Sequence, residues 1–423
     1  MVPPQVKKYL ESRAINGPWT ITGSERGDFD GAVVIPALAE SEYLFATLQS
    51  LAQNPSGNLS GFLILVVVNH RQDAPRSDKS DNEHTLQRLA AGDPSLKNLH
   101  LAWVDVASKG LELPAKGGGV GLARKIGFDL SLPRLRFGPF TPLLISLDAD
   151  TLVRPEYLPA LIRHFQRTKV PGAVVPFCHR PGSSREQDEA IRRYELFLRV
   201  YVLGLSRACS AYAFHTVGSA MACVAESYCR MGGMNLRVAG EDFYFLQHLA
   251  KTGGIAQVKG TVVYPSARAS HRVPFGTGRS ISRLLGKDEE AVLFYQKDCF
   301  QILGEWLTLI AQNLHSGGEE IRERSERISV HLAEYLDSTG FITVWDRLKK
   351  NFRDPANRTA GFHGWFDGLK TMKLIHYLSA GPMPRSEPEN VVPGILGWAG
   401  LEPVQGIDRQ LALLREIQIG EPY

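Results

Sequence analysis

LLISLDAD, residues 143–150 of the chain, is an apolar run that ends in two carboxylates one residue apart. Such a run is typical of a buried strand, in which side chains at positions i and i+2 point the same way. We therefore expect Asp148 and Asp150 to project together from the carboxyl end of a strand, where open α/β sheets bind their ligands. Two like charges held close favour a cation between them, and divalent metals prefer oxygen ligands. For this motif alone, a helix cap at Asp150 or Thr151 is the competing interpretation.

Apolar runs alternate with helical patterns on both sides of this stretch. Strands are predicted at residues 31–36, 62–68, 99–106, 143–147 and 173–176, and helices at about 40–52, 82–90 and 120–130. Pro36 is expected to end the first strand, because proline cannot donate to a strand ladder. Strands that are apolar throughout and separated by helices indicate an α/β fold with a mostly parallel sheet covered on both faces.

The pattern predicts three regions. Residues 1–28 are expected to form a loosely structured lead-in, residues 29–280 the α/β domain, and residues 281–423 an α-helical C-terminal extension with long helices at 289–314 and 319–336. An amphipathic helix is predicted within residues 194–213. We expect its apolar face to join the core, with peripheral membrane contact as the alternative.

Composition excludes several classes of protein. The 48 basic and 44 acidic residues give a net charge of +4, which argues against a nucleic-acid binder driven by bulk charge. The five cysteines include no Cys-x-x-Cys pair, so neither a disulfide framework nor a structural zinc site is expected. The sequence has no signal-like apolar start and no window of about 18 apolar residues. Together these features predict a cytoplasmic protein without a transmembrane segment.

Five local patterns occur in order along the chain. They are VVIPALAE at residues 33–40, VVVNH at 66–70, KGGGVGLARK at 116–125, DAD at 148–150 and GED at 240–242. Together they resemble the GT-A fold glycosyltransferases that use nucleotide sugars, most closely glycosyltransferase family 2. The resemblance covers about residues 31–279 and implies a Rossmann-like GT-A domain.

The resemblance implies a set of nucleotide contacts. They fall at the two strand ends, at the Gly-rich loop with the helix after it, and at the first aspartate of DAD: Pro36, Ala37, Glu40, Asn69, Gly119, Arg124 and Asp148. Lys125 is a further basic residue at this helix start, and a solvated basic helix start is the alternative for both cations. Many relatives carry an aspartate where this chain has Asn69, so the identity of the base stays open. For Glu40 the alternative is an acidic residue in the first turn of a helix.

The resemblance also implies a divalent metal, Mn²⁺ or Mg²⁺, held by Asp148, Asp150 and His271. Arg272 and Arg279 would contact the diphosphate of the donor. A loop histidine bonded to backbone is the alternative for His271. The metal would offset charge on the departing nucleoside diphosphate.

The GED pattern supplies the expected catalytic carboxylates. In inverting relatives a carboxylate at this place removes the proton of the acceptor hydroxyl, which maps to Asp242, with Glu241 as a second acceptor contact or the alternative base. Gly218 and Ser219 resemble the segment that lines the donor sugar. A pair of acids at a helix N-terminus is the purely structural alternative for Glu241 and Asp242.

We therefore predict a metal-dependent glycosyltransferase that takes a sugar from a nucleotide-diphospho donor, with a UDP-sugar favoured, and passes it to an unidentified hydroxyl acceptor with inversion. The alternatives are a retaining GT-A transferase acting on a small glycerate-type acceptor and a non-catalytic nucleotide-binding relative. A sugar nucleotidyltransferase is disfavoured, because its Gly-rich loop follows the first strand, whereas these glycines follow the third.

Overall fold

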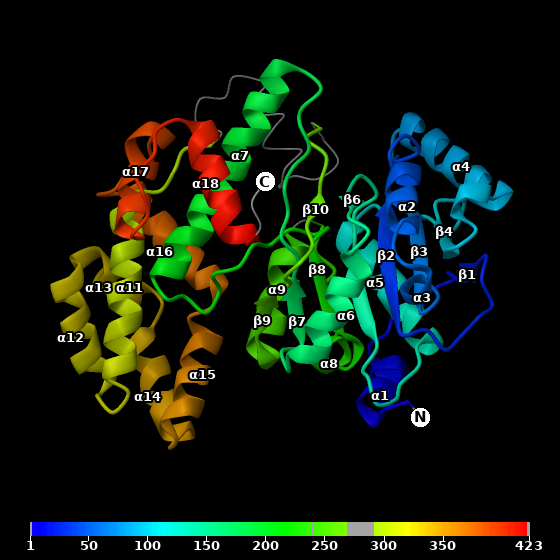
Figure 1. Ribbon diagram of the computed structural model, residues 1–423. Coiled ribbons are helices and arrows are strands. Elements are labelled where there is room, and N and C mark those ends of the chain that lie inside the picture. Colours follow the sequence, from blue (N-terminus) through cyan, green and yellow to red (C-terminus); the bar gives the residue numbers. More distant parts are fainter. Residues whose placement is uncertain (1, 239, 269–291, 421–423) are drawn as a thin grey trace. The chain divides into compact units, whose positions relative to one another are not determined.

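The computed structural model describes residues 2–238, 240–268 and 292–420 (Figure 1). They form two compact units. The first contains residues 2–191, 216–268 and 419–420, and the second contains residues 192–215 and 292–418. The sequence analysis placed residues 29–280 together in the α/β domain, but residues 192–215 belong to the second unit.

An eight-stranded sheet forms the centre of the first unit, in the order β1-β4-β3-β2-β5-β8-β7-β9. Its strands are β1 (Ile21–Thr22), β2 (Gly31–Ala37), β3 (Phe62–Asn69), β4 (His100–Val106), β5 (Leu143–Ser146), β7 (Gly172–Val174), β8 (Met221–Val224) and β9 (Ile255–Gln257). Strands β4, β3, β2 and β5 are parallel neighbours, and β7 pairs with β9 in parallel. The predicted α/β fold with a mostly parallel sheet is confirmed.

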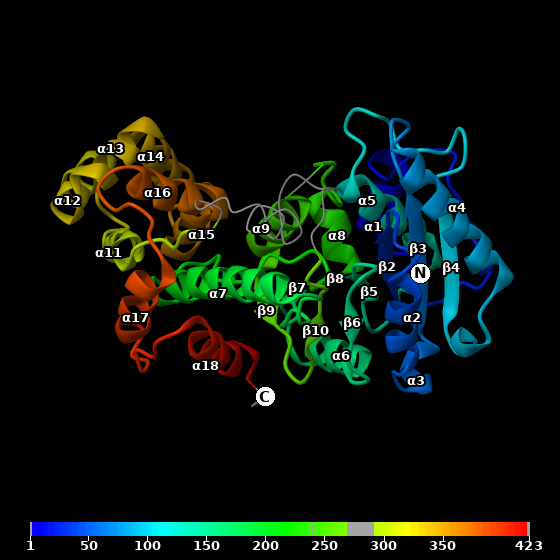
Figure 2. The same cartoon turned by 90° about the horizontal axis from the view of Figure 1, so that it is seen from above.

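Helices cover both faces of this sheet, which is why every residue of β2 and β3 is buried. The helices are α1 (Pro4–Ser12), α2 (Leu44–Ala52), α3 (Ser56–Leu59), α4 (Arg76–Ala91), α5 (Val120–Ser131), α6 (Tyr157–Arg167), α8 (Ala225–Met231) and α9 (Glu241–Gly253). In Figure 2, α5, α8 and α9 lie on one side of the sheet and α2 and α6 on the other. Strands β2, β3, β5 and β7 are thus buried on two sides, as continuous apolar runs require, whereas β4 alternates buried and partly exposed residues.

The prediction that Pro36 ends the first strand is wrong, because β2 continues to Ala37. Pairing of β2 with β5 stops at Val34, whereas pairing with β3 continues to Ala37. Beyond Val34 the strand has a neighbour on one side only, so a residue without an N–H is tolerated there.

The strand order places a topological switch point between β2 and β5. From β2 the chain proceeds outward to β3 and then β4, and it returns to form β5 on the other side of β2. In open α/β sheets the loops at such a switch point diverge, and ligands bind in the crevice between them. Residues 38–43 and 147–151 leave the carboxyl ends of β2 and β5.

Strands β1, β8 and β9 and a second, separate sheet were not predicted. Strand β8 runs antiparallel to both β5 and β7, and a separate two-stranded sheet pairs β6 (Leu152–Val153) with β10 (Val263–Tyr264). These strands have two to four residues, too few to show an alternation in sequence. Both matter for the site, since they bring residues from far along the chain to the carboxyl end of β5.

The lead-in is partly helical rather than loosely structured. Helix α1 packs against α8, and the Tyr9 ring lies 5.6 Å from the ring of Tyr228. The hydroxyls of Tyr9 and Tyr228 both donate to the Asp129 carboxylate, at 2.8 and 2.7 Å. Lys125 forms an ion pair with the same carboxylate at 2.8 Å. This buried cluster holds the N-terminal segment to α5.

The second unit is helical, as predicted for the C-terminal extension. It contains most of α7 (Arg185–Arg207), together with α11 (Lys297–Gln312), α12 (Gly318–Ile328), α13 (Val330–Ser338), α14 (Phe341–Asn351), α15 (Pro355–Trp365), α16 (Gly368–Ala380), α17 (Pro388–Trp398) and α18 (Ile407–Ile419). Its core is built around Trp306 and Trp345, both fully buried. None of the helices in the described part of the chain combines the length and apolarity of a bilayer span.

Two helix predictions in this unit need correction. The helix predicted at 289–314 begins only at Lys297 among the described residues, and the one predicted at 319–336 is two helices. Ser329 breaks the second pattern, because its backbone is extended and its hydroxyl caps the N-terminus of α13. Residues on either side share one apolar face, so periodicity alone could not reveal the break.

Candidate active site

Three chain segments meet at the carboxyl ends of β2 and β5. Glu40 follows β2, the Asp148-Ala149-Asp150 motif follows β5, and Gly218 and Ser219 precede the antiparallel strand β8. Ser146 at the end of β5 pairs with Met221 at the start of β8, so the turn before β8 lies beside the motif. The sequence patterns at both strand ends are thus brought to the same edge of the sheet.

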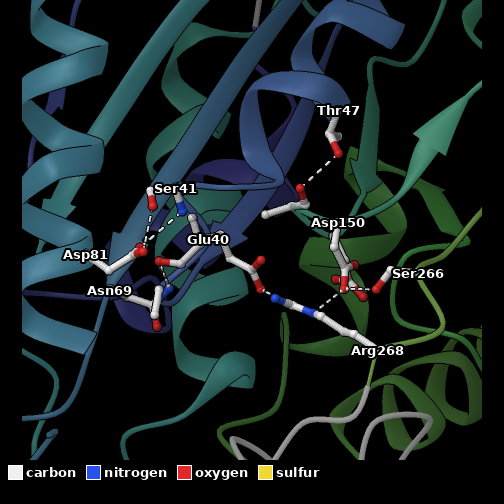
Figure 3. Close-up of polar contacts among 12 residues, drawn as sticks. Glu40, Ser41, Thr47, Asn69, Asp81, Asp150, Ser266 and Arg268 are labelled. Atoms are coloured by element: carbon white, nitrogen blue, oxygen red, sulfur yellow. Dashed lines mark hydrogen bonds and ion pairs between the residues drawn. The ribbon is translucent and has the colours of Figure 1, made fainter. Parts of the chain in front are cut away.

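Backbone contacts hold the aspartate motif in place. The backbone N–H of Thr151 donates to the carbonyl of Asp148 at 3.1 Å, which closes a tight turn. From α2, the hydroxyl of Thr47 donates to the carbonyl of Ala149 at 2.8 Å (Figure 3). Asp150 is in this turn and does not cap α6, which begins at Tyr157. The competing interpretation as a helix cap is therefore wrong.

Arg124 joins two of the acidic motifs. Its guanidinium forms ion pairs with the carboxylates of Asp148 and Glu241, and Nε donates to the hydroxyl of Ser146 at 2.9 Å. The side chain is 3% exposed, whereas that of Asp148 is 36% exposed. Burial raises the pKa of Asp148, and the guanidinium counteracts that shift. Arg124 thus lies beneath the crevice as an internal cation and leaves one edge of Asp148 accessible from outside.

Arg268 joins another pair of carboxylates. Its Nε donates to Oδ2 of Asp150 at 3.0 Å, and its Nη2 forms an ion pair with Glu40 (Figure 3). The hydroxyl of Ser266 donates to the same oxygen of Asp150 at 2.6 Å. The sequence analysis missed Arg268 and Ser266, because they depend on the antiparallel pairing of β10 with β6, which brings their segment beside Asp150.

Glu40 belongs to a turn that is fixed from α4. The backbone N–H of Ala39 donates to Asn82 at 2.9 Å, and Ser41 donates to Asp81 through both its backbone and its hydroxyl. Ala39 has φ 52°, a left-handed conformation that is uncommon for a residue with a Cβ. Since α2 begins only at Leu44, Glu40 lies before that helix and not in its first turn. The turn, with Pro36 and Ala37 at the end of β2, instead carries Glu40 toward Arg268.

Asn69 ends β3 with its amide fixed in one orientation. Its amide nitrogen donates to the carbonyls of Val67 at 2.9 Å and Ala37 at 3.3 Å. Two backbone acceptors on one side require the nitrogen there, so the amide oxygen faces the other way (Figure 3). No described residue donates to this oxygen. Asn69 therefore offers a ligand an acceptor and not a donor.

The glycines of the Gly-rich loop allow close contact between protein segments. A Cβ on Gly119 would lie 2.9 Å from the Cα of Val238, and one on Gly121 would lie 2.6 Å from the carbonyl of Arg237. These glycines let the start of α5 approach residues 235–238, the segment just before α9. Lys125 turns away from the crevice to Tyr9 and Asp129, so neither cation at this helix start is solvated.

Gly218 and Ser219 adjoin the guanidinium of Arg124. A Cβ on Gly218 would lie 2.5 Å from Nη2 of Arg124, which leaves no room for a side chain. Ser219 is 1% exposed, and its hydroxyl has no hydrogen-bond partner among the described residues. The turn before β8 thus packs directly over the arginine that links Asp148 to Glu241.

Glu241 and Asp242 begin α9 and differ in their contacts. Glu241 is buried and paired with Arg124, and burial raises its pKa to about 7. Asp242 accepts the backbone N–H of Phe243 at 2.7 Å, and burial also raises its pKa. Both acids lie at the N-terminus of α9. Glu241 is held by an ion pair with Arg124, and Asp242 by a hydrogen bond to the helix backbone.

The two aspartates fit a hard divalent cation. Arg124 engages Oδ1 of Asp148, and Ser266 and Arg268 engage Oδ2 of Asp150. Among the described residues, none donates to the other oxygen of either carboxylate, so each aspartate retains one oxygen for a metal. Residues 2–238, 240–268 and 292–420 contain no cluster of three or more metal-ligand side chains. His271, Arg272 and Arg279 lie outside the described residues.

Neither a protein-family model nor a curated protein matches this sequence. The structure is similar to a solved fragment of TarS from S. aureus, with 12% identity, a TM-score of 0.36, and coverage of 94% of this chain and 93% of that chain. It is also similar to the mannosyltransferase PcManGT from Pyrobaculum calidifontis, solved with GDP-Man and Mn²⁺, with 14% identity, a TM-score of 0.39, and 98% and 92% coverage. Glucosyl-3-phosphoglycerate synthase of M. tuberculosis is similar with 17% identity, a TM-score of 0.33, and coverage of 67% of this chain and 83% of that chain. Similarities this weak leave the question of function to the residues described above.

Proposed function

We propose that this protein is a metal-dependent glycosyltransferase that moves a sugar from a nucleotide-diphospho donor, preferably a UDP-sugar, to a hydroxyl acceptor with inversion. One observation carries the proposal. Asp148, from the DAD motif, and Glu241, from the GED motif, lie on the same guanidinium at the switch point of the sheet. This shared ion pairing supports a single site, because it holds one carboxylate of each motif on the same side chain.

Asp148 and Asp150 are the proposed metal ligands, together with His271. A bound Mn²⁺ or Mg²⁺ would supply electrostatic stabilisation of charge on the departing diphosphate. Arg272 and Arg279 are proposed to contact the same diphosphate. The carboxylate oxygens of Asp148 and Asp150 that no described residue engages support this role, because hard cations prefer such ligands.

The nucleotide is proposed to bind along the ends of β2 and β3. Pro36, Ala37 and Glu40 would contact it from one side, and Asn69 would accept an N–H of the base through its fixed amide oxygen. An imide N–H of the kind present in uracil suits this acceptor. Gly119 is proposed to border the nucleotide from the start of α5. Arg124 is buried, so it would not touch the nucleotide itself. It would act by holding Asp148, which is proposed to contact the metal and the ribose.

Asp242 is the proposed general base, and Gly218 and Ser219 are proposed to line the donor sugar. Asp242 would take the proton of the acceptor hydroxyl as its oxygen bonds to the anomeric carbon, while the bond from that carbon to the diphosphate breaks. A raised pKa makes a carboxylate a better proton acceptor, which supports this role. Glu241 is the alternative base, but its ion pair with Arg124 lowers its availability.

A screen of nucleotide sugars for metal-dependent hydrolysis tests this function without knowledge of the acceptor. We expect one donor to be hydrolysed only with Mn²⁺ or Mg²⁺, and Asp150→Asn to reduce that rate by about two orders of magnitude or more. Asp30→Asn is the matched control, since Asp30 precedes β2 at the opposite end of the strand and forms an exposed pair with Arg136. Calorimetry showing no metal-dependent binding of any nucleoside diphosphate would reject the proposal. Once an acceptor is found, NMR of the product's anomeric carbon distinguishes inversion from retention.

A further inference from the structure

Arg268 occupies the crevice in which the donor diphosphate is proposed to bind. Its guanidinium spans Glu40, which follows β2, and Asp150, which follows β5 by way of the aspartate turn (Figure 3). These are the two strands that diverge at the switch point. A single side chain therefore links the loops that follow the two strands.

The guanidinium of Arg268 is held by an aromatic ring as well as by the two carboxylates. Its guanidinium lies 4.7 Å from the centre of the Tyr43 ring, at a distance typical of a cation–π contact. The side chains of Arg268 and Asp150 are each 19% exposed, so the ion pair is only partly screened by water. Tyr43 orients the guanidinium from one side, and the two carboxylates fix it in the crevice.

The charges explain why a cation is needed here. Glu40, Asp148 and Asp150 lie around one crevice, and like charges held close oppose ionisation. Arg124 neutralises Asp148 from beneath, and Arg268 neutralises Glu40 and Asp150. Arg268 is thus a cation shared by the carboxylates of Glu40 and Asp150.

We propose that Arg268 is the internal counter-ion of the donor site and a diphosphate ligand once the donor binds. A cation on Asp150 places like charge beside the guanidinium and weakens its pairing with that carboxylate. A diphosphate brought with the cation offers oxygens that a guanidinium can bind through two parallel hydrogen bonds. The metal and the diphosphate should therefore each raise the affinity of the other through Arg268. The inference rests on the proposed function and adds a residue that sequence reasoning did not identify.

Calorimetry with Mn²⁺ alone, and with UDP or GDP in the absence and presence of Mn²⁺, tests the proposal on the full chain. Arg268→Gln removes the competing charge, so it should bind Mn²⁺ alone more tightly, on the order of tenfold. The same variant should bind the nucleoside diphosphate about tenfold more weakly at saturating Mn²⁺. The factor by which the metal raises nucleotide affinity equals the factor by which the nucleotide raises metal affinity. This factor should be smaller in Arg268→Gln than in the wild type.

Two further variants make the result decisive. Arg268→Lys retains the charge but loses the planar guanidinium that donates two parallel hydrogen bonds. Its affinity for Mn²⁺ alone should stay as weak as that of the wild type, and its affinity for the nucleotide should fall. This variant carries the test if Arg268→Gln does not fold. Arg136→Gln removes an arginine from the exposed pair with Asp30 and should leave both affinities unchanged.

The possible failures are distinguishable. If the wild-type chain binds neither UDP nor GDP with Mn²⁺, the proposed function fails. If the wild-type chain binds one of them and Arg268→Gln binds both ligands as the wild type does, only the role of Arg268 fails. A folded Arg268→Gln variant that loses affinity for Mn²⁺ alone would also reject the role, since that result indicates a purely structural contact.

Discussion

The α-carbon of Gly218 lies so near the guanidinium of Arg124 that a Cβ there would be 2.5 Å from Nη2. This contact links the turn proposed to line the donor sugar with the cation that holds Asp148 and Glu241. The arginine is buried and fixed by three partners, so it has little room to retreat. The geometry of both acidic motifs therefore depends on the absence of a side chain at position 218.

Gly218→Ala should move Arg124 and separate its two carboxylates. We expect kcat/KM of donor hydrolysis to fall about a hundredfold, because a displacement of about 1 Å can cost that much. Gly57→Ala is the control, since no atom beyond its chain neighbours and its own helix backbone lies within 4 Å of the added Cβ. Equal activities of the two variants would show that the packing of Gly218 on Arg124 is irrelevant to the site.

Asp242→Asn should lower activity and raise stability at high pH. Removal of a general base is expected to reduce kcat by about 10²–10⁴-fold. Burial raises the pKa of Asp242 above its unfolded value of about 3.9, so the folded state opposes ionisation. Stability is therefore lost as pH rises from the unfolded pKa to the folded pKa, and the amide avoids that loss.

Differential scanning calorimetry between pH 4 and pH 8 measures this effect. The Tm of Asp242→Asn should exceed that of the wild type by more at pH 8 than at pH 4. Asp30→Asn makes the same chemical change at a carboxylate that is exposed and paired on the surface, so it serves as the control. A Tm difference for Asp242→Asn that is independent of pH would contradict the assigned direction.

Thr47→Val should loosen the aspartate turn. The substitution keeps the shape of the side chain and removes the 2.8 Å hydrogen bond to the carbonyl of Ala149. We expect a loss of about 1–3 kcal/mol of stability and weaker binding of metal and nucleotide together. Ser131→Ala also removes a buried hydroxyl that donates to a backbone carbonyl, but on α5, and should lose stability without losing affinity. Unchanged metal affinity in Thr47→Val would separate this threonine from the site.

Tyr9→Phe should destabilise the first unit. The hydroxyl of Tyr9 donates to Asp129 and accepts from Lys125 at 2.6 Å, so its loss leaves buried partners unsatisfied. We expect a loss of about 1–3 kcal/mol in urea unfolding. In Tyr377→Phe, where the tyrosine is 41% exposed, the change should stay within about 0.5 kcal/mol. Similar values for the two variants would mean that α1 does not contribute through this cluster.

Much of the α/β domain could be predicted from local patterns. Apolar runs identified β2, β3, β4, β5 and β7, and the carboxylate spacing identified the turn after β5. The antiparallel strand β8 and the β6–β10 pair could not be predicted, because two to four residues show no periodicity. The same brevity concealed Ser266 and Arg268, whose places beside Asp150 follow from that pairing.

The sequence by itself determined which residues carry charge and which of them share a strand end, because a side-chain period of two is a local property. Only the tertiary structure decided which charges pair. Arg124 was expected at the ligand and is instead buried between Asp148 and Glu241, 24 and 117 residues away. Arg268 was not expected and bridges Glu40 and Asp150, 228 and 118 residues away. Such pairs depend on strand order and register, which bring distant segments together and which no local pattern records.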